Sequence, residues 1–453
     1  MLAVAAAADW SQFRGPNAAG VSNDGDLPTE FSPARNVVWK TALPRGASSP
    51  VLAGDRIYLT GAEGSRLIAF CLDRQSGRIL WRREIAASRA EVLHKLNDPA
   101  SGTPVTDGRN VYVFFGNFGM ASYGEDGNER WRLPLGPFTN LHGMGASPVL
   151  AGGAVIMNCD QDVGSFLLAV DASSGKVRWK TDRSEVTHGY STPVVHGDEL
   201  IVPGAYQMIA YSLKTGEKTW WVRGLTWQPK SAPVIGGGMV FFNGWAPGGD
   251  PGRQYDLPPW EQVLQERDAN RDGKIAQSEL PKEWQPTGSW GAVDLDDDGL
   301  LNAREWSFFR ARRAARNNLM AIRLGGRGDV TGTHVAWRFS KALPDVPCPL
   351  LYRGVLYLVR TGGIATTLDP ATGEVHKQER LQGALDGYYS SPIGADGKVY
   401  MASEAGKVVV LTAAADWRVL AINDLEEPIY ATPAVEAGRL YIRTQGALYC
   451  FGK

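Results

Sequence analysis

A tripeptide consisting of a small residue, a proline and an apolar residue recurs eight times along this chain of 453 residues. Most neighbouring copies are roughly 40 to 54 residues apart, and about 70 additional residues separate the fifth copy from the sixth. Such a spacing predicts a repeat architecture, in which each unit packs mainly against its two neighbours. The copies are Ser49-Pro50-Val51, Thr103-Pro104-Val105, Ser147-Pro148-Val149, Thr192-Pro193-Val194, Ala232-Pro233-Val234, Cys348-Pro349-Leu350, Ser391-Pro392-Ile393 and Thr432-Pro433-Ala434.

Each unit also contains alternating strand patterns and a characteristic turn. In the clearest copies an Asp begins the turn, a Gly ends it, and a Trp follows shortly after. The Asp side chain can cap the turn, the Gly accepts a positive φ, and the Trp offers a large flat surface that can pack between neighbouring units. The full pattern runs from Asp73 to Gly77 before Trp81 and from Asp171 to Gly175 before Trp179, with variants before Trp131, Trp220 and Lys377.

Four strands in each of eight units predict an all-β fold, namely an eight-bladed β-propeller of four-stranded antiparallel blades. The segment Asn36 to Lys40 precedes the first repeat and matches only the last strand of a unit. The final unit, in contrast, stops after Leu448-Tyr449-Cys450-Phe451 without such a strand. We therefore expect the segment that carries Trp39 to supply the outer strand of the C-terminal blade and so to close the ring.

The repeated turn and tryptophan resemble the tryptophan-docking motif of the pyrroloquinoline-quinone (PQQ)-like, or quinoprotein-type, β-propeller repeat family. The resemblance covers nearly the whole chain outside the long interval between the fifth and sixth copies. It implies the propeller fold, but it does not decide the activity. The family includes quinone-dependent alcohol and sugar dehydrogenases, and it also includes cofactor-free binding and scaffold propellers such as the outer-membrane protein assembly lipoprotein.

The long interval contains two copies of the EF-hand calcium-loop pattern. In this pattern, side-chain oxygens at positions 1, 3 and 5 converge on one ion, Gly at position 6 permits a sharp turn, position 7 supplies its carbonyl, and Glu at position 12 closes the site. The predicted ligands are Asp268, Asn270, Asp272, Lys274 and Glu279 in the first loop, and Asp294, Asp296, Asp298, Leu300, Asn302 and Glu305 in the second. Lys274 and Leu300 would each contribute a main-chain carbonyl.

The two loops predict a small α-helical EF-hand pair over residues 247–317, inserted in the fifth blade of a propeller that occupies residues 9–246 and 318–453. Ile275 and Leu301, at position 8 of each loop, can pair as a short β-bridge. The context favours a structural use of calcium over a sensory one, because calcium loops of extracellular modules bind weakly. The second loop has more carboxylates than the first, so we expect it to bind calcium more tightly.

Ligands of propellers bind near the axis, where the segments that lead into the first strands converge. Polar and aromatic residues precede several of the repeated prolines. Trp227 or Tyr389 could stack on a planar quinone, and Lys230 or His188 could meet its carboxylates, but the same residues could simply hydrate a central channel. The wider predicted lining includes Asn97, His142, Met144, Tyr190, Gln228, Asp386, Tyr388, Glu427 and Tyr430.

No catalytic residue can be assigned from the sequence. The family's dehydrogenases use a disulfide between adjacent cysteines, and this chain has no adjacent cysteines. Their calcium ligands and catalytic base match no position here. The compact group Asp160, Gln161 and Asp162 could bind a metal, but capping of a loop is the favoured interpretation.

Net charge and composition exclude some classes of binding partner. The formal net charge of -1 gives no basic field for nucleic acid, and no stretch is long and apolar enough for a transmembrane segment. Residues 1–8 resemble the end of a signal peptide, which predicts a periplasmic or secreted protein. We also expect a monomer whose four cysteines are buried thiols.

Two functions are compatible with these features. The first is an exported calcium-binding propeller that binds a protein, a peptide or a polysaccharide without catalysis. The alternative is a PQQ-dependent alcohol or sugar dehydrogenase that uses the axial funnel.

Overall fold

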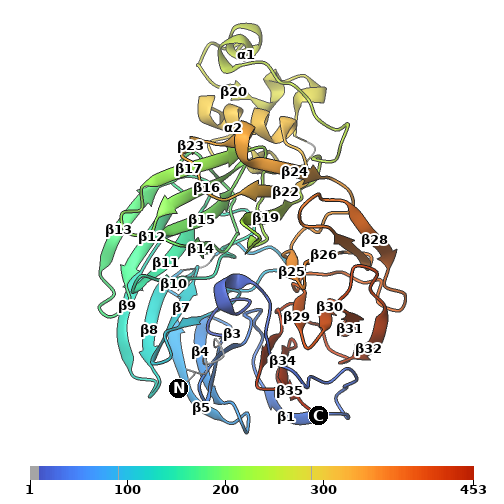
Figure 1. The fold of residues 1–453 in the computed structure, drawn as a ribbon. Coiled ribbons are helices and arrows are strands. Elements are labelled where there is room, and N and C mark those ends of the chain that lie inside the picture. Colours follow the sequence, from blue (N-terminus) through green and yellow to red (C-terminus); the bar gives the residue numbers. More distant parts are fainter. Residues whose placement is uncertain (1–9, 90, 287) are drawn as a thin grey trace.

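The structure is a computed structural model and describes residues 10–89, 91–286 and 288–453, so the predicted signal-peptide remnant lies outside the described residues. Eight sheets are arranged radially around one axis (Figure 1), and each contains four antiparallel strands of the repeat. The predicted all-β, eight-bladed propeller is therefore confirmed.

The first four blades follow the chain order without interruption. Blade 1 contains β2 (Val51–Ala53), β3 (Arg56–Glu63), β4 (Arg66–Asp73) and β5 (Ile79–Ala86). Blade 2 contains β6 (Val105–Thr106), β7 (Asn110–Phe115), β8 (Gly119–Gly124) and β9 (Glu129–Pro134). Blade 3 contains β10 (Val149–Ala151), β11 (Ala154–Cys159), β12 (Phe166–Asp171) and β13 (Val177–Asp182). Blade 4 contains β14 (Val194–His196), β15 (Glu199–Gly204), β16 (Gln207–Ser212) and β17 (Lys218–Arg223).

The remaining blades include the interrupted one and the one that closes the ring. Blade 5 contains β18 (Val234–Gly236), β19 (Met239–Gly244), β22 (Asn318–Arg323) and β24 (Val335–Phe339). Blade 6 contains β25 (Leu350–Tyr352), β26 (Val355–Arg360), β27 (Ile364–Leu368) and β28 (Val375–Arg380). Blade 7 contains β29 (Ile393–Ala395), β30 (Lys398–Ala402), β31 (Lys407–Thr412) and β32 (Val419–Asp424). Blade 8 contains β33 (Ala434–Glu436), β34 (Arg439–Arg443), β35 (Ala447–Phe451) and β1 (Val37–Ala42).

Blade 8 combines the two ends of the chain. Strand β1 pairs antiparallel with β35, and Trp39 lies opposite Cys450. The predicted closure of the ring by the segment around Trp39 is confirmed. The hydrophobic core is divided among the spaces between blades, where the fully buried inner strands of one blade pack against those of the next.

Five of the repeated tryptophans dock their blade onto the next. The Trp39 indole donates a hydrogen bond to the Arg74 carbonyl of blade 1 at 3.1 Å, and a Cβ on Gly77 would lie only 2.5 Å from the Trp39 ring. Gly77 also has a φ of 72°, so glycine is required both for space and for conformation. The same contact joins Trp81 to Glu125, Trp131 to Ala172, Trp179 to Leu213 and Trp337 to Pro370.

A ring of hydrogen bonds surrounds the axis at the small residue before each repeated proline. The backbone N–H of Ser49 donates to the Thr103 hydroxyl, and Thr103 donates in the same way to Ser147 of the following blade, each at 3.0 Å. Cys348 takes part through its sulfur, which accepts from the Ala232 N–H at 3.0 Å. The other links of the ring are Ser147 to Thr192, Cys348 to Ser391, Ser391 to Thr432, and Thr432 back to Ser49.

The segment before β1 crosses one end of the axis and ties several blades together. It contains the short 3₁₀ helix η1 (Pro16–Ala18) and the fully buried Arg14, whose Nη2 donates to the Pro349 carbonyl of blade 6 at 2.9 Å. The Trp10 carbonyl accepts from Leu52 of blade 1 at 2.8 Å. Asn17 exchanges two hydrogen bonds of 2.8 Å with Val195 of blade 4. This segment therefore acts as a plug for the axial channel.

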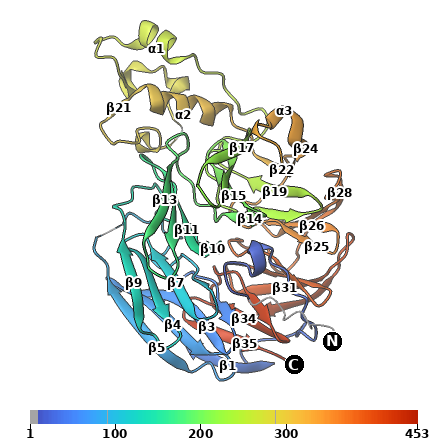
Figure 2. The same ribbon diagram turned by 60° about the vertical axis from the view of Figure 1, so that its left-hand side comes forward.

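The insertion, residues 247–317, follows β19 and ends before β22, and it projects from the rim of the ring above blade 4 and blade 5 (Figures 1 and 2). Its helical and strand elements are α1 (Trp260–Arg267), β20 (Ile275–Ala276), η2 (Gln277–Glu279), η3 (Lys282–Trp284), η4 (Trp290–Ala292), β21 (Leu300–Leu301) and α2 (Ala303–Ala314). After β22 the chain adds β23 (Gly328–Asp329), which pairs parallel with β17, and α3 (Thr331–His334).

The ring of hydrogen bonds predicts a specific pattern of stability. Thr103→Val removes the acceptor of a buried N–H while nearly keeping the side-chain shape, so we expect the free energy of unfolding to fall by about 1–3 kcal/mol. Thr103→Ser keeps the hydroxyl and should change less. Urea unfolding of the wild type and both variants measures the difference. A loss in the serine variant as large as or larger than that in the valine variant would show that the hydrogen bond does not dominate the contribution of Thr103.

Candidate functional site

A cavity of about 360 Å³ lies on the axis, between the segments that lead into the first strands. A narrower continuation of about 130 Å³ runs along the ring of hydrogen bonds to Phe13 of the plug. The main cavity, called the axial cavity below, is lined by Ala47, His94, Leu96, Asn97, Ser101, His142, Gly145, Tyr190, Gln228, Lys230, Trp245, Pro247, Asp345, Val346, Tyr389 and Tyr430.

The charged groups of the axial cavity neutralise each other. Lys230 Nζ and Asp345 Oδ1 are 2.6 Å apart, and Asp345 is the only carboxylate among the lining residues. Burial, together with the nearby Lys230 charge, lowers the pKa of His142 to about 4, so its imidazole is neutral at pH 7. The Lys230–Asp345 pair and His142 therefore contribute no net charge to the cavity near neutral pH.

Aromatic rings and neutral polar groups form the rest of the wall. The rings of Tyr389 and Tyr430 have centroids 5.9 Å apart, and Tyr190 stacks on His142 at 5.6 Å. Burial raises the pKa of Tyr190 well above its usual value, which keeps its hydroxyl protonated. Gln228 Nε2 lies 3.3 Å from His142 Nε2. Such a wall can stack on a flat or apolar ligand surface and exchange hydrogen bonds with its polar groups.

The four residues proposed as a cofactor site lie in two different places. Lys230 and Tyr389 line the axial cavity, whereas His188 and Trp227 line a small pocket between the propeller and α2. The rings of His188 and Trp227 meet edge to face with centroids 5.3 Å apart, and the Arg312 guanidinium lies 3.7 Å from the Trp227 ring centroid. The four side chains therefore do not converge on one cavity.

Most of the wider predicted lining does reach the axial cavity, namely Asn97, His142, Tyr190, Gln228 and Tyr430. Met144, Asp386, Tyr388 and Glu427 are not among the lining residues. Glu427, for example, accepts hydrogen bonds from the Thr444 hydroxyl and the Gly446 N–H. Sequence reasoning missed His94, Trp245 and Asp345. Asp345 stands shortly before Pro349, much as Lys230 stands before Pro233, so its position in the repeat could have revealed it. Trp245 directly follows β19, where no repeated proline marks the axis.

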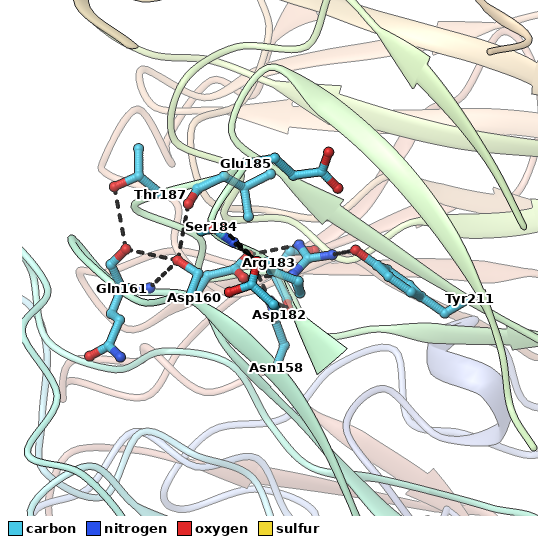
Figure 3. Close-up of polar contacts among 12 residues, drawn as sticks. Asn158, Asp160, Gln161, Asp182, Arg183, Ser184, Glu185, Thr187 and Tyr211 are labelled. Atoms are coloured by element: carbon cyan, nitrogen blue, oxygen red, sulfur yellow. Dashed lines mark hydrogen bonds and ion pairs between the residues drawn. The ribbon is translucent and has the colours of Figure 1, made fainter. Parts of the chain in front are cut away.

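Asp160 and Gln161, two members of the compact acidic group, have a structural role (Figure 3). Both carboxylate oxygens of the fully buried Asp160 accept from Arg183, at 2.7 and 2.9 Å, and Arg183 also donates to the Tyr211 hydroxyl at 2.6 Å. Gln161 Oε1 accepts from the Thr139 N–H at 3.1 Å. Asp162 Oδ1 lies 3.1 Å from His188 Nε2, and burial raises the pKa of Asp162 and lowers that of His188. Asp160 and Gln161 thus bind neighbouring loops, and Asp160 does so through an ion pair with Arg183 rather than by capping its own loop.

The two acidic loops of the insertion, here called the first loop (268–279) and the second loop (294–305), have the same internal hydrogen bonds. The carboxylate at position 1 accepts from the Gly N–H at position 6, at 2.9 Å for Asp268 and 2.8 Å for Asp294. The glutamate at position 12 accepts from the N–H at position 9, at 2.8 Å for Glu279 and 2.9 Å for Glu305. Strands β20 and β21 join the loops, with Ile275 opposite Leu301.

The second loop gathers its oxygens most closely. Carboxylate oxygens of Asp294, Asp296 and Glu305 all lie within 4.8 Å of one another, and Asp294 and Glu305 are buried. Burial raises the pKa of both buried carboxyls, and the neighbouring carboxylates add to this effect. An all-oxygen donor set of this kind fits a hard divalent cation such as Ca²⁺. Across the loops, Asp298 forms an ion pair with Lys274.

Helix α2 carries Glu305 in its first turn and also anchors the insertion on the propeller. Arg304 Nη2 donates to the Ser184 carbonyl at 3.1 Å, and the Tyr206 hydroxyl donates to the Phe308 carbonyl at 2.9 Å. One turn further on, Arg312 covers Trp227. Trp306 and Phe309 of the same helix pack in the insertion's own core.

Residues 32–125 and 120–244 match the family model described as outer membrane protein assembly factor BamB. BamB of Burkholderia pseudomallei (strain K96243) is 26% identical over 202 residues, which are 42% of this chain and 47% of that protein. A polyvinylalcohol dehydrogenase of Pseudomonas sp. is 26% identical over 185 residues, which are 36% of this chain and 28% of that enzyme. The chain thus matches less than half the length of each of these relatives.

Solved structures share the fold over nearly the whole chain. BamB from Moraxella catarrhalis has a TM-score of 0.59 at 12% identity and covers 92% of this chain and 97% of its own. Quinohemoprotein alcohol dehydrogenase from Comamonas testosteroni has a TM-score of 0.61 at 13% identity and covers 100% of this chain and 82% of its own. At these identities the likeness concerns the fold alone.

The fold and its axial cavity define an eight-bladed propeller with docking tryptophans. Together with the family-model match over residues 32–244 and the similarity to BamB, they support assignment of the chain to the PQQ-like β-propeller repeat family. No helix among the described residues has the length and apolar character needed to cross a membrane.

Proposed function

We propose that this chain is an extracytoplasmic, calcium-binding propeller that binds a protein or polysaccharide partner at its axial cavity without catalysing a reaction. The observation that carries the proposal is the cavity wall, which combines aromatic rings and neutral polar groups with one self-neutralised ion pair, Lys230 and Asp345. This wall suits recognition by stacking and hydrogen bonding. The BamB relatives, which are named as assembly factors of the outer membrane, support an extracytoplasmic role with a macromolecular partner.

The dehydrogenase alternative is supported by the polyvinylalcohol dehydrogenase relative and by the presence of Lys230 and Tyr389 in the axial cavity. The lining residues, however, do not fit the group that such an enzyme needs. The family's dehydrogenases hold a calcium ion beside the quinone with several oxygen ligands, and here Asp345, the only lining carboxylate, is held by Lys230. Trp227 and His188, which were expected to contact the quinone, lie under α2. The binding role is therefore preferred.

A quinone-binding experiment separates the two functions. Purified protein is mixed with PQQ and Ca²⁺, and both the cofactor absorbance and the dye-linked oxidation of alcohols and sugars are followed. We expect neither a spectral change nor turnover, because the axial cavity offers no set of free carboxylates for the ion beside the quinone. Quinone binding with turnover would contradict the non-catalytic proposal and establish the dehydrogenase.

The calcium proposal concerns the ligands in the insertion, namely Asp268, Asn270, Asp272, Lys274 and Glu279 in the first loop and Asp294, Asp296, Asp298, Leu300, Asn302 and Glu305 in the second. The hydrogen bonds shared by the two loops and the clustered oxygens of the second support an EF-hand pair. We propose that the ions act as structural staples that hold the insertion together.

Removal of the position 12 glutamates tests this proposal. Calcium at about a hundredfold excess over its dissociation constant should stabilise the wild type by about 2.7 kcal/mol if one site dominates. We expect Glu279→Gln with Glu305→Gln to abolish most of this gain, because each change removes a bidentate ligand. The melting temperature with Ca²⁺ and with chelator is the measurement. Glu283→Gln, at an exposed position between the loops, is the control. An undiminished calcium effect in the double variant would rule out the EF-hand assignment.

A further inference from the structure

We propose that Arg312 is a positioning residue through which calcium in the second loop controls the order of the axial cavity wall. The inference rests on the proposed calcium binding and concerns a route from the insertion to the cavity. The route has three parts: helix α2, the segment 225–230, and the residues of that segment that line the cavity.

The first part is the helix itself. Glu305, the proposed position 12 ligand, lies in the first turn of α2, and Asn302 caps this turn by accepting hydrogen bonds from Arg304 and Glu305. Arg312 lies about two turns further along the same helix. A helix transmits a displacement or an ordering of its first turn along its whole length, because its hydrogen bonds join each turn to the next.

The second part is the contact between α2 and the propeller. The Arg312 guanidinium lies 3.7 Å from the centroid of Trp227, which is only 5% exposed, so this cation–π contact is largely shielded from water. A second contact reaches the same segment. The Phe308 carbonyl accepts from the Tyr206 hydroxyl, and the Tyr206 N–H donates to the Thr226 carbonyl at 3.0 Å. Two residues of α2 therefore hold one short segment of the propeller.

The third part is the segment that follows Trp227. Gln228 and Lys230 both line the axial cavity, where they meet His142 and Asp345 respectively. The intervening Pro229 accepts a hydrogen bond from the Tyr190 N–H at 2.9 Å, and Tyr190 is a further wall residue. Gln228 and Lys230 follow Trp227 by one and three residues. A change in how well Trp227 is ordered therefore reaches the cavity wall through a very short stretch of backbone.

Calcium supplies the difference between two states of this route. Without the ion, the clustered carboxylates of Asp294, Asp296 and Glu305 repel one another at the start of α2. Bound Ca²⁺ removes this repulsion and holds Glu305 in place, so that the helix loses freedom at its first turn. Ordering of one element lowers the cost of ordering the groups that contact it, and this is a recognised source of coupling between sites.

Hydrogen exchange of the full chain tests the route with Ca²⁺ as the only added ligand. We expect Ca²⁺ to slow exchange in residues 225–232 about fivefold or more, which is the lower end of typical coupling between sites. Arg312→Leu should abolish this slowing, whereas Arg312→Lys, which retains a cation above the ring, should preserve much of it. Arg316→Leu is the matched control, because Arg316 is exposed near the end of the insertion.

The outcomes distinguish this inference from the calcium proposal. Slowing in the second loop without slowing in residues 225–232 would overturn the coupling and leave calcium binding intact. Slowing in residues 225–232 that persists in Arg312→Leu would overturn the role of Arg312. An absence of slowing in the second loop would contradict calcium binding and remove the basis of the coupling. Unchanged exchange in blades 1 and 2 verifies that each variant is folded.

Discussion

The ring of hydrogen bonds at the axis is the interaction on which the rest of this structure depends. Seven of the eight blades donate a backbone N–H to the small side chain at the same position of the following blade, and blade 4 is the exception because Ala232 of blade 5 has no side-chain acceptor. Because these groups are buried, an unmatched N–H would carry a desolvation cost, so the ring fixes both the angle and the height at which successive blades meet. At the outer rim five tryptophans repeat this constraint, since their indoles reach the turn of the next blade. The axial hydrogen bonds and the outer tryptophans thus fix the inner and outer edges of a blade, and its apolar strands can then pack against the next blade in only one arrangement.

The axial cavity is a consequence of this closure. The segments before the repeated prolines must converge because the ring holds their ends together, and the cavity is the space that their side chains leave. The plug that contains Phe13 and Arg14 crosses the channel at its narrow end. A ligand of the axial cavity therefore meets residues from many blades at once, and its specificity is set by loop residues that the fold does not constrain.

The sequence predicts the features that depend on local, repeated patterns. The number of blades, the closing strand around Trp39 and the docking tryptophans follow from spacing and turn chemistry alone. The cavity was predicted less well, because position before a proline does not determine which way a side chain points. His188 and Trp227 point under α2, an element that is outside the repeat, and Trp245 enters the wall from the end of β19, just before the insertion. No pattern within the repeat carries information about these contacts.

The insertion is placed where the repeat is weakest. Blade 5 has Ala232 in place of a hydroxyl or thiol residue, so it provides no side-chain acceptor to the axial ring. The Trp220 indole, which has no docking turn on the next blade, donates instead to Glu199 of its own blade, and β23 pairs along the edge of β17. The contacts of α2 with Ser184, Tyr206 and Trp227 lie on the same side of the ring and hold blade 4 and its neighbouring loops from outside. The insertion thus adds contacts beside a junction at which the repeat lacks two of its usual interblade bonds, and the proposed calcium ions would hold these contacts in place.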